Sequence, residues 1–261
     1  MNQINQTPPR KILSIPNDPS PYVIVEPKNP KSDWCVLWIG GWTSAIDKHY
    51  GGLVRMADMS GVSFAMMEFA GFGQHPIALG DSTKAQQIVE ARYFYDFLRE
   101  EYKKIIVIGG SFGAYVAAQL SDKNPAAIVL RVPAIHDDQH EYIPYRRLKE
   151  DGNDDDKDYA RLYAERWNEN APHVFDKTLK PLGEYEGMVY VIRHENDEEV
   201  PRWIPDLYFQ TAKRGNYMLV PGAGHAPMTT NAAAPQKYYD YIEKMVTDIV
   251  GLEIMAKEKE L

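Results

Sequence analysis

The chain of 261 residues carries a formal net charge of −8, with 44% hydrophobic and 25% charged residues. These values suit one globular α/β domain with a well-buried core and room for an inserted subdomain. The acidic balance argues against nucleic acid as a partner, because phosphate binding needs clustered lysine and arginine. The single cysteine, Cys35, excludes an intramolecular disulfide, and its apolar surroundings are typical of a buried structural thiol.

Two further features bear on location. Residues 1–10 are polar and lack the apolar core of a signal peptide. No apolar run approaches the roughly 20 residues of a membrane span. We therefore expect a cytoplasmic protein without a membrane-spanning helix, and the sequence leaves monomer and homodimer open.

The first part of the chain predicts a hairpin and two buried strands. Residues 11–15 and 22–26 are rich in β-branched side chains and flank dense turn residues, which is typical of an edge hairpin. Residues 34–39 are a continuous apolar run, as expected for a strand buried on both faces of a parallel sheet, and residues 63–69 predict another buried strand. A helix over residues 48–58 is predicted between them.

The next part predicts a long helix and two more strands. Apolar residues recur at helical spacing up to about residue 102, with Asp81 or Ser82 as the N-cap. Strands are predicted at 105–109 and 126–132, with a helix of small residues between them.

The alternation of strands and helices stops between residues 133 and 186. This stretch is polar, holds many aromatic residues and an acidic run at 150–156, and predicts one helix near 158–169. Some fifty residues without a core strand indicate a cap over the carboxyl edge of a sheet. We therefore assign residues 1–132 and 187–261 to the core and 133–186 to a cap insertion.

The alternation then resumes with strands at 188–193 and 216–220 and helices at 201–212 and 233–250. The whole pattern predicts an α/β fold, with a mostly parallel sheet covered by helices on both faces. In such sheets the chemistry collects just beyond the carboxyl ends of the strands.

The strand at 105–109 ends in the motif Gly109-Gly110-Ser111-Phe112-Gly113. A sharp turn that lifts a serine between strand and helix leaves no room for a Cβ on its neighbours, which explains the two outer glycines. The motif alone arises by chance in about one chain in ten of this length, so Ser111 needs partners before it counts as a nucleophile.

Such partners follow two later strands. Asp197 lies just after the strand at 188–193, and His225 follows the strand at 216–220 in a glycine-rich loop. Serine needs an adjacent base, histidine is the usual one, and a carboxylate fixes the tautomer of that histidine. The chain order Ser, Asp, His predicts Ser111 as nucleophile, His225 as base and Asp197 as acid.

With these pieces the chain resembles an α/β-hydrolase over about residues 20–250. The matching motifs are Gly109 to Gly113 as nucleophile elbow, Asp197 with Val200-Pro201, Gly222-Ala223-Gly224-His225, Gly71-Phe72-Gly73, and Gly40-Gly41-Trp42. Two positions depart from the family pattern: Gly40 replaces a histidine of the oxyanion loop, and His194 stands where glycine is common.

The resemblance implies that the backbone N–H groups of Trp42 and Phe112 form an oxyanion hole, with Gly41 beside the substrate. The compact core with one cap of about fifty residues is similar to that of monoglyceride-lipase-like and feruloyl (cinnamoyl) esterase-like enzymes, which favour small or medium esters, aromatic acyl groups among them. The resemblance therefore implies a serine carboxylic-ester hydrolase with a small-molecule ester as partner, no metal and no cofactor.

Other assignments stay open. Glu195, Glu198 and Glu199 compete with Asp197, and a minority of such folds would place the acid at Asp137 or Asp138. Residues 136–140 also have the composition of a metal site. Aromatic side chains of the cap could line an acyl pocket or simply pack the cap onto the core: Tyr142, Tyr145, Tyr159, Tyr163 and Trp167.

Three other functions compete with ester hydrolysis. The same residues could cleave amides, as in aminopeptidases of this fold, if an acidic residue of the cap held a substrate amine. The fold could also support acyl transfer or lyase chemistry, or a non-catalytic binding protein, because fold does not fix function.

Overall fold

The computed structural model describes residues 9–15, 18–30, 33–138, 141–148, 164, 167–226 and 234–258. Within these ranges, no helix is both long and apolar enough to cross a membrane. The acidic run at 150–156 lies outside the described residues, as do residues 158–163, 165 and 166 of the helix predicted near 158–169, and the described residues 167–169 are not helical.

In the described part of the chain, eight strands form one sheet in the order β1-β2-β4-β3-β5-β6-β7-β8. Their bounds are β1 Lys11–Ile15, β2 Asp18–Val25, β3 Trp34–Ile39, β4 Ser63–Met67, β5 Lys104–Gly110, β6 Ala127–Arg131, β7 Met188–Asn196 and β8 Gly215–Gly224. Strand β2 runs antiparallel to β1 and β4, and the remaining pairs are parallel. The predicted edge hairpin and mostly parallel sheet are therefore confirmed.

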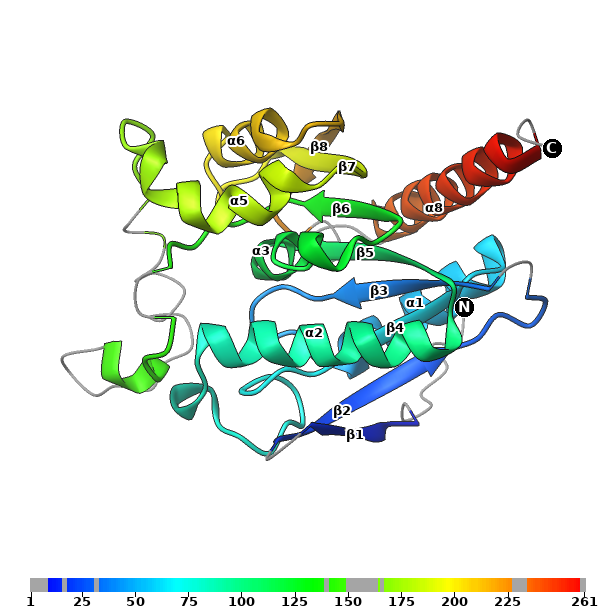
Figure 1. Ribbon diagram of the computed structural model, residues 1–261, viewed down its shortest axis with the longest axis horizontal. Helices are drawn as coiled ribbons and strands as arrows, with labels where there is room; N and C mark the ends of the chain where they lie inside the picture. The colour runs from blue at the N-terminus through cyan, green and yellow to red at the C-terminus, as the bar shows by residue number, and fades with distance from the viewer. Residues whose placement is uncertain are drawn as a thin grey trace.

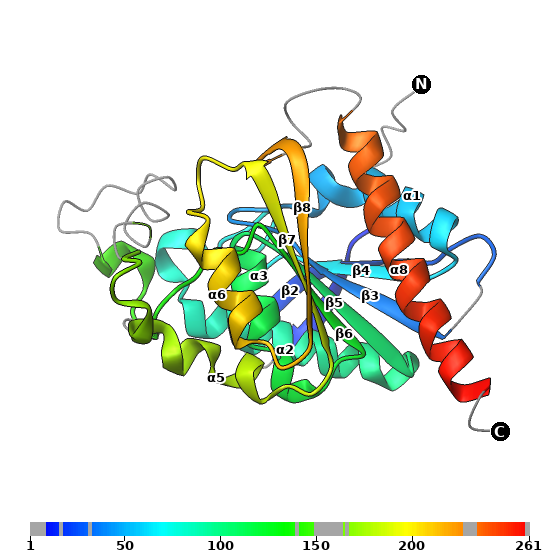
Figure 2. The ribbon, with the colours of Figure 1, turned by 90° about the horizontal axis from the view of Figure 1, so that it is seen from above.

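Helices cover both faces of this sheet. They are α1 Ile46–Ser60, α2 Lys84–Glu101, α3 Phe112–Ala118, α5 Asp176–Glu184, α6 Trp203–Thr211 and α8 Ala234–Glu258. Figure 2 shows α1 and α8 on one face, while α2, α3, α5 and α6 lie on the other. The fold is thus the predicted α/β sandwich of a sheet between two helical layers.

The central strand β3 shows why its sequence is a continuous apolar run. Cys35 and Leu37 belong to the core under α2 and α3, whereas Val36 and Trp38 belong to the core under α1 and α8. Successive side chains of a strand point to opposite faces, so a strand covered twice needs apolar residues at every position.

The start of α2 differs from the prediction. Its N-cap is Thr83, whose hydroxyl accepts a hydrogen bond from the Gln86 N–H at 3.0 Å. Neither of the two predicted residues caps the helix. Asp81 ends a 3₁₀ turn that begins at Leu79, and the Ser82 hydroxyl donates to the Leu79 carbonyl. The short turn thus moves the helix start beyond both residues.

The stretch between β6 and β7 holds no described strand, but its last part is a helix that the sequence did not predict. Helix α5 packs against α3 and α6 and so covers the sheet. The 3₁₀ turns η3 (Tyr145–Leu148) and η4 (Pro172–Phe175) lie beyond the carboxyl ends of β3 and β6 (Figure 1). A cap over 133–186 remains a prediction, and α5 shows that its carboxyl-terminal part belongs with the core helices.

Candidate active site

The turn between β5 and α3 is fixed by close backbone contacts. Ser111 has φ 52° and ψ −119°, a conformation that side-chain-bearing residues rarely adopt. A Cβ on Gly109 would lie 2.2 Å from the Gly113 carbonyl oxygen, and a Cβ on Gly113 would lie 2.3 Å from the Gly40 carbonyl oxygen. The two outer glycines of the motif are therefore required by space, as the sequence predicted.

Asp197 lies one residue after β7, in a loop that its own side chain organises. Its Oδ1 accepts hydrogen bonds from the Glu199 and Val200 N–H groups, each at 3.0 Å. Burial raises the pKa of Asp197, but the hydrogen bonds from His225 and Val200 outweigh burial and hold that pKa below its ordinary value. The carboxylate is thus charged at neutral pH and aimed at His225.

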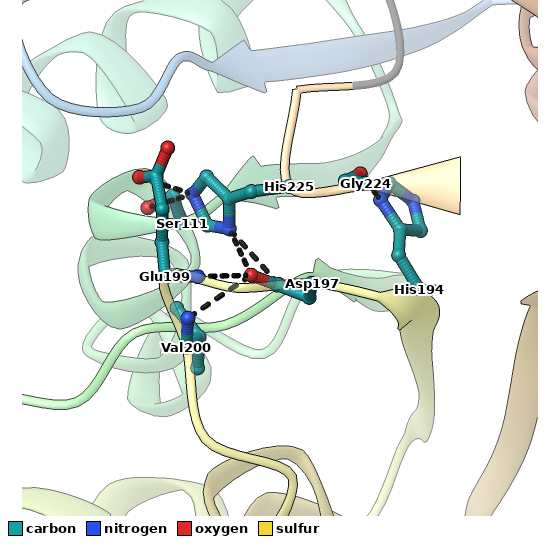
Figure 3. A network of polar contacts seen from close by, with 7 residues as sticks. All are labelled: Ser111, His194, Asp197, Glu199, Val200, Gly224 and His225. Atoms are coloured by element: carbon teal, nitrogen blue, oxygen red, sulfur yellow. Dashed lines mark hydrogen bonds and ion pairs between the residues drawn. The ribbon is translucent and has the colours of Figure 1, made fainter. Parts of the chain in front are cut away.

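His225 lies between this carboxylate and the serine. Its Nδ1 is 2.9 Å from both carboxylate oxygens of Asp197, and its Nε2 is 3.0 Å from Ser111 Oγ (Figure 3). A carboxylate only accepts, so Nδ1 carries the proton and the Nε2 lone pair faces the serine hydroxyl. The structure brings together the three residues that the sequence singled out.

His194, one of the two departures from the family pattern, links the acid loop to the histidine loop. Its Nδ1–H donates to the Gly224 carbonyl at 2.7 Å, and its buried ring meets the Tyr238 ring edge-on at 5.4 Å. Burial lowers the pKa of His194 to about 4, so the ring is neutral at neutral pH. The side chain therefore holds the residue before His225.

Most of the carboxylates that compete with Asp197 for the role of the acid contact groups other than His225. Glu195 accepts from the Gly222 N–H at 2.7 Å. Asp137 lies 3.6 Å from the buried Lys84 ammonium, and Asp138 pairs with Lys177. Among these acids only Glu199 also approaches His225, where its largely exposed carboxylate lies 3.4 Å from Nε2 (Figure 3).

In the described ranges, no three His, Cys, Asp or Glu side chains are grouped so as to hold a metal ion. Of the histidines in the candidate metal segment 136–140, His136 is buried beside Phe112 and Tyr115, and His140 lies outside the described residues.

Two cavities meet at Ser111. The first, here called the tryptophan cavity, has a volume of about 280 Å³ and is lined mainly by Trp42, Phe112, Ala134, His136, Trp167 and Val200. The second, here called the arginine cavity, has a volume of about 550 Å³ and includes Gly41, Lys48, His49, Arg131, Val132 and His225. Ser111, Trp42 and Glu199 line both.

The predicted substrate-binding residues separate into two groups. Gly41 approaches Ser111 closely, since a Cβ there would lie 3.4 Å from Ser111 Cβ, and Trp167 lines the tryptophan cavity. Tyr145 is instead fully buried and donates to Gln87, because it packs the segment after β6 onto α2. Tyr142 is 81% exposed and lines neither cavity. Tyr163 and Tyr159 lie outside the described residues.

Sequence reasoning missed Arg131, His49 and His136 as cavity residues. Arg131 had a usable signal, because it lies at the carboxyl end of a predicted buried strand, where the other site residues were sought. His49 and His136 reach the site through tertiary packing that no local pattern reveals.

The alpha/beta hydrolase family is the class that this fold and site define. The sequence profile of that family matches residues 36–237. The chain therefore belongs to the alpha/beta hydrolase family. A search among curated proteins finds none that matches this sequence.

Similar solved structures share the fold at low sequence identity. Est1E from Butyrivibrio proteoclasticus with bound ferulic acid is 15% identical over 94% of this chain and 99% of that one, with a TM-score of 0.67. A soluble variant of monoglyceride lipase from Saccharomyces cerevisiae is 12% identical over 95% and 97%, with a TM-score of 0.70. A thermophilic esterase from Thermogutta terrifontis is 17% identical over 92% and 98%, with a TM-score of 0.65.

Proposed function

We propose that the protein is a serine hydrolase that cleaves carboxylic esters through an acyl-enzyme. One observation carries the proposal: His225 lies between Ser111 Oγ, at 3.0 Å, and the Asp197 carboxylate, at 2.9 Å. A nucleophile, a base and an orienting acid at hydrogen-bond distance are what acyl transfer by serine requires.

In the proposed reaction Ser111 Oγ attacks the ester carbonyl while His225 Nε2 takes its proton. The tetrahedral intermediate collapses, and the same proton passes from His225 to the leaving alcohol. A water molecule then gives a proton to His225 and attacks the acyl-serine, which releases the acid and restores Ser111. Asp197 stays ionised throughout and stabilises the imidazolium.

The oxyanion is assigned to the N–H groups of Phe112 and Trp42. Phe112 is the first residue of α3, so its N–H is one of the donors that a helix start leaves unused. Trp42 lies in the turn after β3 and lines both cavities with Ser111. Each such donor contributes up to about 3–4 kcal/mol to the transition state.

The proposed substrates are esters with small or medium acyl groups, aromatic ones included. The tryptophan cavity supports this, because its volume of about 280 Å³ lies at the small end of ligand pockets and its walls are largely aromatic and aliphatic. The aromatic acid ferulate is bound in Est1E, a structure that shares this fold.

A panel of esters that varies acyl length and aromaticity tests the proposal, with Ser111→Ala as control. Saturable hydrolysis that is lost in the variant, together with labelling of Ser111 by a fluorophosphonate, is the expected result. A protein that hydrolyses no ester and resists the label would contradict it.

Amide hydrolysis is the second candidate, because Glu199 places an exposed carboxylate at the rim of both cavities, where a substrate amine could bind. An aminoacyl 4-nitroanilide assayed beside the matching ester separates the two. Preference for the anilide, lost in Glu199→Gln, would favour the peptidase function.

A further inference from the structure

Arg131 is a buried cation at the end of β6, directly behind the nucleophile turn. The residue is only 7% exposed, and its guanidinium carbon lies 4.6 Å from the centre of the Trp38 ring and 4.8 Å from that of Tyr238. Its Nε–H donates to the Tyr238 hydroxyl. Two aromatic rings and one hydroxyl thus hold the side chain in place.

The charge of Arg131 has no acidic partner in the part of the chain that the structure describes, since no carboxylate there lies within 4 Å of its nitrogens. Buried charges are normally paired, because leaving water costs several kcal/mol. Of its five N–H groups, one is used by Tyr238, and the two terminal nitrogens donate no hydrogen bond to the described residues, so they can bind an acceptor. An anion is the group that would complete this arrangement.

The guanidinium lies beside the nucleophile turn. The guanidinium lies against Gly110, where an added Cβ would be 3.5 Å from Nη1, and Gly110 precedes Ser111. Arg131 also lines the arginine cavity together with Ser111. An anion bound to Arg131 would therefore lie in the same cavity as the Ser111 hydroxyl.

Among the other polar residues of the arginine cavity, Lys48 adds a positive charge. Lys48 lies exposed in the first part of α1 and lines the same cavity. Burial lowers the pKa of His49 to about 4, so that ring is neutral and shares a contact of 3.3 Å with the Ser44 hydroxyl. Glu199 is the acidic member, but it lies at the rim and its carboxylate approaches His225.

The position of His225 indicates which part of an ester enters this cavity, an argument that rests on the proposed function. His225 lines the arginine cavity but does not appear in the wall of the tryptophan cavity. The proton of the leaving alcohol comes from His225 Nε2, so the alcohol oxygen must lie beside that atom. The alcohol part then extends into the arginine cavity, and the acyl part into the tryptophan cavity.

We propose that the arginine cavity is a subsite for an anionic group, a carboxylate or a phosphate, on the alcohol part of the substrate. Arg131 is its recognition residue and presents two parallel N–H donors, the geometry that suits carboxylate and phosphate oxygens. Lys48 adds a second positive charge at the cavity wall.

Matched esters test this subsite. The series comprises acetyl esters of ω-hydroxy acids of increasing chain length, the same esters with the acid converted to its amide, and esters of the corresponding ω-hydroxyalkyl phosphates. At one chain length we expect kcat/KM for an anionic ester to exceed that of the neutral amide by about 10- to 100-fold, as for other charged hydrogen bonds. Preference for the carboxylate or the phosphate arm identifies the anion, and preference for neither overturns the proposal.

Variants assign the preference to Arg131. The readout is the ratio of kcat/KM for anionic and neutral esters within each variant, so a general loss of activity does not count. Arg131→Met should bring the ratio near one, and Lys48→Gln, at an exposed position that tolerates substitution, should lower it about two- to fivefold. Arg55→Met, which removes an arginine of α1 outside the cavity, should keep the wild-type ratio. A ratio that survives in both Arg131→Met and Lys48→Gln contradicts the assignment.

Binding without turnover separates this subsite from the proposed function. Isothermal titration calorimetry of the Ser111→Ala variant with butanoate, butanamide and inorganic phosphate needs no hydrolysis. We expect an anion to bind and the amide not to bind, with anion binding lost on adding Arg131→Met. If no ester is hydrolysed but the anion still binds, the esterase function fails and the anion site stands; if no anion binds, the site itself fails.

Discussion

The turn that carries Ser111 and the loop that carries His225 are held by different forces. Every residue of α3 is buried, and the turn before it is fixed by backbone contacts around Gly109 and Gly113. Each residue of β8 is half-buried or exposed, and the loop after it depends on the hydrogen bond from His194. The nucleophile turn should therefore tolerate no added volume, whereas the histidine loop should tolerate added volume and should respond to the protonation of its polar partner, His194.

The largest expected effect comes from removing the nucleophile itself, which leaves both regions intact. Ser111→Ala should lower kcat for an activated ester such as 4-nitrophenyl butanoate by about 10⁵- to 10⁶-fold. Its midpoint of thermal unfolding should change little, because the Cβ and the turn are kept. Turnover with an acyl-enzyme burst in this variant would contradict the mechanism.

The second largest effect tests the hydrogen bond between Asp197 and His225. Asp197→Asn should lower kcat by about 10⁴-fold, since the amide favours the wrong tautomer of His225. Asp138→Asn is the matched control, because Asp138 pairs with Lys177 and not with His225. A large loss in the control with full activity in Asp197→Asn would move the acid to the segment after β6.

Two glycine substitutions compare the regions directly. Gly113→Ala should lower the free energy of unfolding by more than about 3 kcal/mol, since its Cβ would lie 2.3 Å from one backbone oxygen and 2.4 Å from another. Gly224→Ala should cost less than about 1 kcal/mol, because its Cβ would lie 3.7 Å from the Asn196 carbonyl. Urea unfolding of both variants gives the comparison, and equal losses would show that the loop is packed as tightly as the turn.

The pH dependence of stability tests the polar partner of the loop. The pKa of His194 is about 4 in the folded protein, below the ordinary value of 6.5, so its contribution is complete above pH 6.5 and is lost as the pH falls toward 4. The loss for this one residue is about 3 kcal/mol. His194→Phe keeps an aromatic ring against Tyr238. When the free energy of unfolding of this variant is measured with urea at several pH values, its slope against pH over this range should be smaller than that of wild type, by the amount that corresponds to about one proton.

At pH 8 the same variant should be less stable than wild type by only about 1 kcal/mol, the typical value of the lost hydrogen bond to Gly224. An unchanged acid slope in His194→Phe would mean that other groups control the acid sensitivity of this loop.

The sequence predicted the structure best at positions where a single physical requirement explains which residue type is present. The runs at 34–39 and 105–109 had to be strands covered on both faces, and the elbow glycines had to be small. Ser111, Asp197 and His225 were found because each follows the carboxyl end of a predicted strand, and those ends meet at one edge of the sheet.

What could not be predicted depends on distant packing. Helix α5 contains Pro181 and lies in a polar stretch, so local propensity argued against it. The sequence offered no ground for choosing whether Tyr145 lines a pocket or packs in the core. In the structure its hydroxyl contacts Gln87 on α2, which places the side chain in the core. The sequence predicted only that Arg131 belongs to a strand, because Trp38 and Tyr238, the residues that contact its guanidinium, are far away in the sequence.

The burial of Cys35 also provides an experimental probe. The thiol is fully buried in β3, between β4 and β5, and burial raises its pKa well above the ordinary value. A thiol reagent can reach it only when the middle of the sheet opens. Since the chain has no other cysteine, the alkylation rate of the unmodified protein reports opening of the central strands, and any cysteine introduced at the surface can be labelled selectively in the folded state.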